Sequence, residues 1–243
     1  MKAELTEIME SIQGEGLLLG VKQVFLRFAG CNLSCAYCDT PASRGPSELC
    51  RLYSKTGSKE LAEEISNPLS SEQIVDLVRQ FDASWISFTG GEPLLWADSI
   101  ADLMAVFKPH GYKFLLETNG TLVQELDKCL PLLDMISMDF KLPSATGYDC
   151  WDRHRHFLLK ARKKPCYVKI VITADTTYNE INTAVELIKS IDKKVPLVLQ
   201  PVTPGYGAPA SALGFLLTLQ DLALQELEDV RLIPQMHPFM GLI

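Results

Sequence analysis

Short runs of β-branched and aromatic residues alternate with stretches of helical periodicity along most of the chain. Apolar runs of about four to eight residues that are bounded by turn residues predict strands. The predicted strands span residues 24–28, 85–89, 113–118, 135–139, 167–172, 197–200 and 230–233. The alternation of such strands with helical segments predicts an α/β protein.

Between the strands, apolar residues recur at positions i, i+3, i+4 and i+7, which predicts amphipathic helices. Three such sets lie within residues 74–81, 100–107 and 181–188. Ser70 and Gln73 have the spacing of a capping box at the start of the first of these helices. A further helix is expected over the basic stretch 153–164, with its charged residues on a solvated face.

Strands separated by helices imply parallel pairing through right-handed crossovers. About six β/α units with an N-terminal extension are too few for a closed eight-fold barrel. The sequence therefore predicts a partial, open parallel β/α barrel, and an open doubly wound sheet is the alternative. We expect one domain over residues 1–243, in which residues 41–69 form an insertion at the barrel mouth with one short helix at 59–65.

Polar or glycine residues follow the carboxyl end of nearly every predicted strand. They are the 31–38 loop, TGGEP at 89–93, ETNG at 117–120, Asp139, Lys141, Thr173, Gln200, Gln235 and His237. In parallel barrels the active site is built on that face. These separate stretches are therefore expected to converge on one mouth.

The 243-residue chain has 23 basic and 30 acidic residues, which gives a formal net charge of −7. This charge argues against nonspecific nucleic-acid binding, so no nucleic-acid partner is expected. No apolar run approaches the roughly 18 residues of a membrane helix, and the first residues lack the apolar core of a signal peptide. A reducing cytoplasm is therefore the expected location, and no membrane partner is expected.

Three of the seven cysteines, Cys31, Cys35 and Cys38, have the spacing C-x3-C-x2-C. Three thiolates on one short loop can bind a 4Fe–4S cluster through three of its irons, which leaves the fourth iron open to a small molecule. A zinc site would need a fourth ligand, and a thiol–disulfide motif at Cys35 and Cys38 would leave Cys31 unexplained. The remaining cysteines have no ligand-like spacing and are interpreted as core or surface thiols.

The second motif, TGGEP at residues 89–93, closes the second predicted strand. Its glycines allow close approach of a ligand to the backbone, and Glu92 can accept hydrogen bonds from an ammonium group. Together with the cysteine triplet, this motif resembles that of the radical S-adenosylmethionine (SAM) enzymes. The resemblance implies that SAM binds the open iron and is cleaved to a 5′-deoxyadenosyl radical, which takes a hydrogen atom from the substrate.

The same resemblance implies a set of SAM-binding residues. They are Tyr37, Cys38, Asp39, Gly91, Glu92, Asp139, Lys141, Thr173 and Gln200. For the polar residues at strand ends, a purely structural role is the alternative.

Further segments resemble the 7-carboxy-7-deazaguanine synthases, and together they span nearly the whole chain. They are ESIQGEG at 10–16, FLRFAG at 25–30, CDTP at 38–41, LETNGT at 116–121 and IPQMH at 233–237. The resemblance implies conversion of 6-carboxy-5,6,7,8-tetrahydropterin to 7-carboxy-7-deazaguanine and ammonia, in the 7-deazapurine pathway that leads to queuosine. It also implies that SAM is regenerated and that Mg²⁺ assists, with Thr40 as a ligand; hard oxygen donors suit that ion.

Polar groups that converge on the mouth are candidates to bind the pterin. They are Ile12, Gln13, Gly14, Glu15, Gly16, Arg27, Thr89, Asn119, Gln235, His237 and, through the terminal carboxylate, Ile243. Glu117 and His237 are the candidate catalytic residues. Arg27 is a cation within an apolar strand, which is costly unless it is paired. It is expected either to pair with the substrate carboxylate or to form a structural salt bridge.

Two other classes of protein are compatible with parts of the pattern. A glycyl-radical-enzyme activase, or another radical SAM enzyme, shares the cluster motif, although the QGEG segment at 13–16 and the PQMH tail argue against an activase. A noncatalytic iron–sulfur carrier would have four cysteine ligands and no need for the GGE motif. The family resemblance also implies a flavodoxin- or ferredoxin-like reductant and a homodimer.

Overall fold

The centre of the molecule is a ten-stranded sheet, within the residues that the computed structural model describes, which are 1–54, 56–57, 60–203 and 212–242. In chain order its strands are β2 (Leu5–Ile12), β3 (Lys22–Phe28), β4 (Leu49–Tyr53), β5 (Leu61–Ser66), β7 (Trp85–Gly90), β8 (Lys113–Thr118), β9 (Met135–Asp139), β10 (Cys166–Ile172), β11 (Leu197–Pro201) and β12 (Val230–Leu232). Across the sheet they follow the order β12-β11-β10-β9-β8-β7-β3-β2-β4-β5. The short strands β1 (Lys2–Ala3) and β6 (Leu69–Ser70) pair with each other in a separate small sheet.

From β3 to β12, each neighbouring pair of strands in the described sheet is parallel. These are the strands predicted from the sequence, with small shifts at their ends. At the other end of the sheet, β2 runs antiparallel to β3, β4 runs parallel to β2, and β5 runs antiparallel to β4. The N-terminal extension is therefore part of the sheet, and β2 separates the predicted barrel strands from the β4–β5 hairpin.

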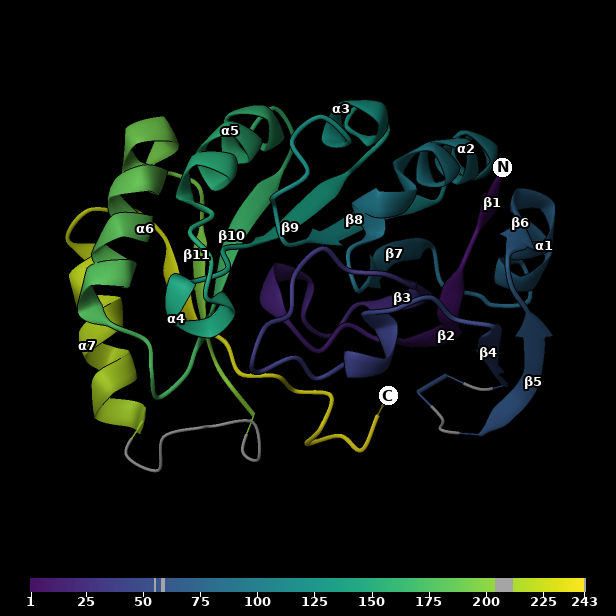
Figure 1. The fold of residues 1–243 in the computed structure, drawn as a ribbon, viewed down its shortest axis with the longest axis horizontal. Coiled ribbons are helices and arrows are strands. Elements are labelled where there is room, and N and C mark those ends of the chain that lie inside the picture. Colours follow the sequence, from purple (N-terminus) through teal and green to yellow (C-terminus); the bar gives the residue numbers. More distant parts are fainter. Residues whose placement is uncertain (55, 58–59, 204–211, 243) are drawn as a thin grey trace.

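The longer helices lie along the outer side of the curved row of strands (Figure 1). The helices are α1 (Ser71–Val78), α2 (Ala97–Phe107), α3 (Leu126–Cys129), α4 (Pro143–Thr146), α5 (Trp151–Ala161), α6 (Tyr178–Asp192) and α7 (Ala212–Leu224), with 3₁₀ turns η1 (Gly16–Leu18), η2 (Pro41–Ser43), η3 (Pro93–Trp96) and η4 (Lys108–His110). Parallel strands that curve inside one layer of helices form the predicted partial barrel, and the doubly wound alternative does not apply. None of the helices described here is both long and apolar enough to cross a membrane.

The alternation of side chains along each strand places a core on one face of the sheet and a cleft on the other. Val24, Leu26 and Phe28 of β3 belong to the main hydrophobic core, whereas Phe25 and Arg27 line the cleft. The predicted apolar faces of α1, α2 and α6 supply the helical side of this core. The inner face of the sheet thus carries the polar and ionisable side chains together with a few apolar ones such as Phe25.

Two local predictions for the helices have different outcomes. The capping box at α1 is confirmed, because the Ser70 hydroxyl accepts from the Gln73 N–H at 3.2 Å and Gln73 Oε1 accepts from the Ser70 N–H at 2.9 Å. The basic stretch does form α5, but its face is not wholly solvated. His154 is fully buried there and stacks on the ring of Phe140 with centroids 4.7 Å apart.

The short helix predicted at residues 59–65 is wrong, because residues 61–66 form β5. The LAEE sequence at 61–64 has helical propensity, but the antiparallel ladder to β4 overrides this local preference. Most residues of β5 are exposed, as suits the last strand of the sheet. The segment 41–69 therefore adds two strands to the sheet, while its beginning, near Arg44, lies at the cleft.

Candidate active site

A cleft of about 600 Å³ opens on the inner face of the sheet, where the parallel strands end. Predicted site residues from distant segments of the chain meet in it. Those that line the cleft are Ile12, Gln13, Gly14, Glu15, Arg27, Cys31, Cys35, Tyr37, Cys38, Asp39, Thr40, Thr89, Gly91, Glu117, Asn119, Asp139, Lys141, Gln200, Gln235 and His237. The expected convergence at the carboxyl ends of the strands is therefore observed.

A few of the predicted residues are placed elsewhere. Gly16, at φ +60°, packs on Tyr167, whose hydroxyl would lie 2.0 Å from a Cβ at this position. Thr173 belongs to a turn before α6, where its N–H donates to the Thr176 hydroxyl at 2.9 Å. Neither lines the cleft, and Ile243 lies outside the described residues.

The loop that carries Cys31, Cys35 and Cys38 is held by the segment that follows it. The N–H of Cys31 donates to the carbonyl of Arg44 at 3.0 Å, and the Arg44 guanidinium donates back to the carbonyl of Cys35. A hydrogen bond to the Cys38 sulfur raises the pKa of Arg44, while burial raises the pKa of the Cys31 and Cys35 thiols. A guanidinium therefore lies beside the cysteines, where it offsets negative charge.

The cysteines suit a cluster better than a single metal ion. Among the residues described, no three His, Cys, Asp or Glu side chains converge closely enough to hold one ion. A 4Fe–4S cluster makes a different demand, because each cysteine binds a separate iron at a corner of the cube. Cys31, Cys35 and Cys38 all line one cleft, and none of the other cysteines does. This donor set fits a cluster with one iron open to a ligand.

Gly90 and Gly91 allow the cysteine loop to approach the end of β7. A Cβ on Gly91 would lie 2.1 Å from the carbonyl oxygen of Gly30, and one on Gly90, at φ +131°, would lie 2.2 Å from the carbonyl oxygen of Phe28. The sequence predicts close approach of a ligand at these glycines. In the structure the closest neighbour is the backbone that leads into the cysteine loop, so the glycines position that loop.

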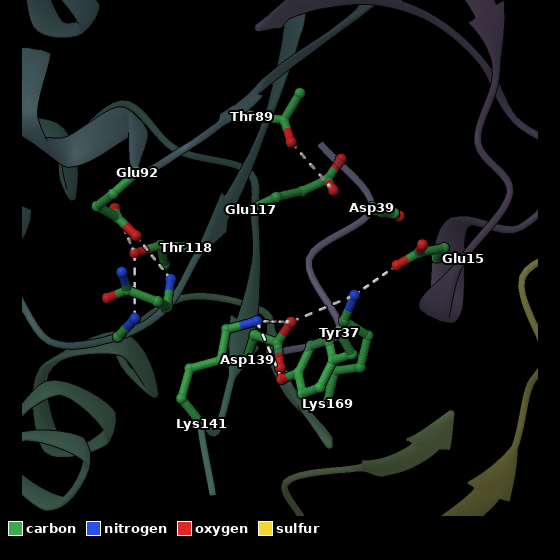
Figure 2. Close-up of polar contacts among 12 residues, drawn as sticks. Glu15, Tyr37, Asp39, Thr89, Glu92, Glu117, Thr118, Asp139, Lys141 and Lys169 are labelled. Atoms are coloured by element: carbon green, nitrogen blue, oxygen red, sulfur yellow. Dashed lines mark hydrogen bonds and ion pairs between the residues drawn. The ribbon is translucent and has the colours of Figure 1, made fainter. Parts of the chain in front are cut away.

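Glu92 is fully buried and does not line the cleft. It accepts hydrogen bonds from the Thr118 hydroxyl at 2.7 Å, the Asn119 N–H at 2.8 Å and the Leu94 N–H at 3.1 Å. Burial raises the pKa of Glu92 to about 7, against the effect of these donors. Glu92 thus joins the GGE turn to the end of β8 (Figure 2).

One wall of the cleft, the far wall, is formed by the predicted SAM-binding residues Tyr37, Asp139, Lys141 and Gln200. Lys141 Nζ lies 2.8 Å from Asp139 Oδ2, 3.4 Å from the Tyr37 hydroxyl and 5.2 Å from the centre of the Tyr37 ring. Burial disfavours the charge on Lys141, yet the Asp139 carboxylate keeps its pKa well above the usual value. Asp139 Oδ1 and Gln200 Oε1 are buried and have no hydrogen-bond partner among the described residues. Two acceptors in a cleft wall are thus available to a ligand.

A second charged group joins the N-terminal segment to this wall. Lys169 of β10 forms an ion pair with Glu15 Oε2 and lies 3.4 Å from Asp139 Oδ2 (Figure 2). Burial raises and Lys169 lowers the pKa of Glu15, and the net result is a pKa of about 2. Gln235 donates to Glu15 Oε1 at 2.7 Å and to Asp39 Oδ2 at 2.9 Å. The C-terminal tail, the N-terminal segment and the cysteine loop are thereby connected.

Glu117 of β8 also lines the cleft. Its carboxylate accepts from the Ser87 hydroxyl at 2.5 Å, from Gln13 Nε2 at 3.0 Å and from the Thr89 hydroxyl at 3.5 Å. Burial raises the pKa of Glu117. A buried carboxyl group among hydroxyl and amide donors is a candidate to exchange a proton with a bound molecule.

Arg27 and His237 both line the cleft. Arg27 Nε donates to Glu7 Oε2 at 2.8 Å, so the structural salt bridge considered for this residue is present while Arg27 also lines the cleft. His237 packs tightly on Gly14, where a Cβ would lie 2.7 Å from the imidazole Nδ1. The main chain is also joined here, since the Met236 N–H donates to the Gly14 carbonyl at 2.9 Å.

Sequence reasoning missed several residues that line the cleft. Lys169 had a usable signal, because it is a lone cation on the strand Cys166–Ile172, as Arg27 is within the predicted strand 24–28. In the structure it is in register with Asp139. The apolar lining residues had no such signal. They are Met9, Phe25, Leu33, Val171 and Val202, together with Leu242 of the tail.

Comparison with known proteins places the chain in a family. Residues 26–188 match the Radical SAM superfamily, so the chain belongs to this superfamily, which implies a 4Fe–4S cluster and SAM as cofactors. A 7-carboxy-7-deazaguanine synthase of Geobacter sulfurreducens is 42% identical over 246 residues, covering 98% of this chain and 97% of the relative. One of Methanothermobacter thermautotrophicus is 36% identical over 263 residues, covering 100% and 98%. The chain therefore belongs to the family of 7-carboxy-7-deazaguanine synthases.

The fold agrees with this assignment. The crystal structure of QueE from Escherichia coli superposes with a TM-score of 0.68 at 22% sequence identity, covering 97% of this chain and 94% of that one. The structure of TYW1 with a lysine–pyruvate adduct is more distant, with a TM-score of 0.58 and 12% identity over 84% of this chain and 74% of that one. At these identities the likeness concerns the fold.

Proposed function

We propose that this chain converts 6-carboxy-5,6,7,8-tetrahydropterin to 7-carboxy-7-deazaguanine and ammonia by a radical ring contraction, in the 7-deazapurine pathway that leads to queuosine. The observation that carries the proposal is the shared cleft. One space of about 600 Å³ is bordered by the three cysteines, by Asp139 and Gln200, and by the polar groups around Glu117. Asp139 Oδ1 and Gln200 Oε1 are acceptors without a partner among the described residues. Family membership favours this reaction over an activase or an iron–sulfur carrier.

The residues of the far wall suit SAM. Cys31, Cys35 and Cys38 would hold the cluster, and the cluster with SAM supplies the 5′-deoxyadenosyl radical that takes a hydrogen atom from C6 of the pterin. The Asp139 oxygen without a partner is an acceptor for a ribose hydroxyl, and Lys141 is a cation for the SAM carboxylate. Tyr37, whose ring faces Lys141, covers one side of this region.

The substrate side presents acceptors and donors in an arrangement that suits a pterin edge. Glu117 and Glu15 accept from pterin N–H groups, and Gln13 is fixed between them because it donates to Glu117 and accepts from the Glu15 N–H at 3.1 Å. Arg27 lies next to Thr89 across the β3–β7 ladder and faces the substrate carboxylate while Glu7 holds its Nε. Glu117 and His237 move protons during the loss of ammonia.

We also propose a Mg²⁺ ion at Thr40, two residues beyond Cys38. Thr40 lines the cleft next to the cysteine loop, and its hydroxyl together with water and the substrate carboxylate would give the oxygen donors that Mg²⁺ requires. The ion would then fix the pterin carboxylate close to the SAM side of the cleft.

The test uses the chain after anaerobic reconstitution of the cluster. The protein is reduced and incubated with SAM, Mg²⁺ and the tetrahydropterin, and we expect release of ammonia and appearance of the deazapurine chromophore. Cys35→Ala should abolish SAM cleavage, whereas Cys166→Ala, which removes a thiol outside the cleft, should not. SAM cleavage without product would indicate a different radical substrate, and no cleavage by the reconstituted chain would indicate a carrier.

Two further expectations depend on the family resemblance. A flavodoxin- or ferredoxin-like protein is proposed as the reductant, since the cluster must receive one electron at low potential. A homodimer is proposed as the assembly, and the molar mass of the reconstituted protein by light scattering tests it.

A further inference from the structure

We propose that Lys169 is a positioning residue that holds the substrate-side carboxylate Glu15 and the SAM-side carboxylate Asp139 in one arrangement. Through this contact it joins the two binding regions of the cleft. The identities of the two ligands rest on the proposed function, whereas the contact itself does not. Lys169 belongs to none of the motifs identified in the sequence.

The contacts of Lys169 reach both sides of the cleft. Its Nζ forms an ion pair with Glu15 Oε2 and lies 3.4 Å from Asp139 Oδ2. The side chains of Lys169, Glu15 and Asp139 are 11%, 16% and 13% exposed, so water screens their charges only in part. β10 and β9 bring Lys169 and Asp139 into register, which fixes one end of the contact to the rigid sheet.

Each carboxylate has an additional restraint. Gln235 donates to the other oxygen of Glu15 at 2.7 Å, and Lys141 lies 2.8 Å from Asp139 Oδ2. The two ammonium groups therefore share one oxygen of Asp139, which leaves Oδ1 unpartnered among the described residues and available to a ligand. In the described part of the chain, Lys169 is the one cation within salt-bridge distance of the Glu15 carboxylate, and it anchors Glu15 to the sheet.

Removal of the Lys169 ammonium has consequences on both sides. Glu15 would be left as a buried carboxylate without its counter-ion, and such a change weakens binding that depends on the orientation of the group. Asp139 would keep Lys141 as its one cationic partner at Oδ2, so the orientation of its carboxylate, and with it the position of Oδ1, would be less restrained. Loss of a residue that positions both carboxylates should therefore weaken the binding of two ligands. Loss of a residue that contacts a single ligand should weaken the binding of that ligand alone.

The experiment measures the Kd of SAM and the Kd of the tetrahydropterin separately, by titration calorimetry on the cluster-loaded protein. Lys169→Met should raise the Kd of each ligand by about tenfold or more. Lys169→Arg, which keeps the charge, should retain more affinity than Lys169→Met. The matched control is Lys108→Met, which removes a partly buried lysine paired with Asp134 far from the cleft and should change neither Kd.

A double-mutant cycle separates positioning from a general loss of structure. If Lys169 acts on the pterin through Glu15, then Lys169→Met should have little further effect on the pterin Kd in a Glu15→Gln background, while it still weakens SAM. Full additivity on the pterin, or a loss confined to one ligand, would overturn the proposal. So would Kd values that stay within about twofold of the parent for both ligands.

The same measurements distinguish failure of this inference from failure of the proposed function. A parent protein that binds SAM but not the pterin would refute the proposed substrate. The SAM titration of Lys169→Met would still decide the role of Lys169, because an unchanged SAM Kd contradicts it. Iron content and the thermal midpoint of each variant show whether the fold and the cluster are retained.

Discussion

Glu92 combines full burial with three hydrogen-bond donors, and its pKa is raised from the usual 4.5 to about 7. Because the pKa of the folded state lies above that of the unfolded state, the folded chain binds this proton more tightly. The stabilising contribution is therefore complete below about pH 4.5 and is lost as the pH rises through 7. We expect the free energy of unfolding to fall by about 1–3 kcal/mol between pH 4.5 and pH 7 because of the Glu92 carboxyl group.

Urea unfolding of the parent and of Glu92→Gln, both in the same cluster-loaded state, checks this pH dependence. The variant cannot titrate at position 92, so its free energy of unfolding should fall less between pH 5 and pH 8. Parallel profiles for the two proteins would show that the Glu92 pKa is not raised by folding.

His154 is a buried residue whose role is to fix the end of β8. Its Nε2 lies 3.1 Å from the Asn119 carbonyl, and Asn119 Nδ2 donates to Asn32 Oδ1 of the cysteine loop at 2.8 Å. Burial lowers the pKa of His154 to about 4, so the ring is neutral near pH 7. A chain of contacts thus runs from α5 to the cysteine loop.

We expect His154→Leu to lower the free energy of unfolding by about 1–3 kcal/mol, because the Asn119 carbonyl loses its buried partner. The deficit should shrink as the pH falls from 6.5 to 4. In that range His154 of the parent gains a proton in the unfolded state but not in the folded state, so the parent loses stability and the variant does not. His156→Leu, on the exposed face of the same helix, is the control and should change stability by less than about 0.5 kcal/mol. Equal losses in the two variants would contradict the role of His154.

Thr40 is the residue on which the proposed Mg²⁺ site depends. Thr40→Ala removes the hydroxyl without adding bulk, so product formation should lose most of its stimulation by Mg²⁺ while SAM cleavage persists. The measurement is a titration of the reaction rate with Mg²⁺, and Thr183→Ala on the surface of α6 is the control. An unchanged Mg²⁺ response in Thr40→Ala would remove this residue from the site.

At the scale of elements, the GGE turn and the cysteine loop are packed as one unit. Gly91→Ala would place a methyl group 2.1 Å from the Gly30 carbonyl oxygen and 2.5 Å from that of Ser43, and both neighbours are backbone atoms that cannot rotate away. We expect a cost of about 1–3 kcal/mol and a displaced cysteine loop, seen as reduced iron content after reconstitution.

The control for Gly91→Ala is Gly214→Ala in α7, where an added Cβ meets nothing within 4 Å. A helix favours alanine over glycine by up to about 1 kcal/mol, so this variant should be as stable as the parent or more so. Full iron loading of Gly91→Ala would show that the loop does not depend on the close approach.

Elements also show where sequence reasoning succeeds and where it stops. The seven parallel strands β3 and β7 to β12 were predictable because each carries a short apolar run that reports burial on the helix-covered face. β5 was not, because its exposed LAEEIS sequence carries a helical propensity that only pairing with β4 overrides. The hydrophobic pattern of a segment predicts how that segment is buried. Formation of β5 depends on its pairing with β4, which the pattern of one segment does not show.

At the scale of the whole molecule, most of the candidate site followed from the rule that polar residues at the carboxyl ends of parallel strands meet. That rule does not predict which side chains form hydrogen bonds or ion pairs with each other. Glu92 was a candidate ligand contact, and its hydrogen bonds to the end of β8 were not expected. Lys169 was not expected either, although it pairs with Glu15. These assignments depend on distances across the cleft, which the order of residues along a strand does not contain.

The molecule closes its cleft with segments from its two ends. Residues 13–16 and the tail 235–242 lie against each other through the Met236 N–H to Gly14 hydrogen bond and the contact of His237 with Gly14. In Figure 1 the tail runs from β12 across the open side of the barrel toward β2. A ligand held between these segments must therefore restrain both of them, although more than 200 positions separate them in the sequence.

We accordingly expect hydrogen exchange to slow in residues 13–16 and 235–242 together when SAM and the pterin are both bound. Where exchange requires release of the ligand, the slowing reaches about 100-fold at a free ligand concentration of about 100 times Kd. The exposed strand β5 is the internal control, because Leu61–Ser66 lies at the edge of the sheet and does not contact the cleft. Protection of residues 13–16 without protection of the tail would mean that the tail does not close over the ligand, and equal protection of β5 would indicate a general stabilisation in place of local closure.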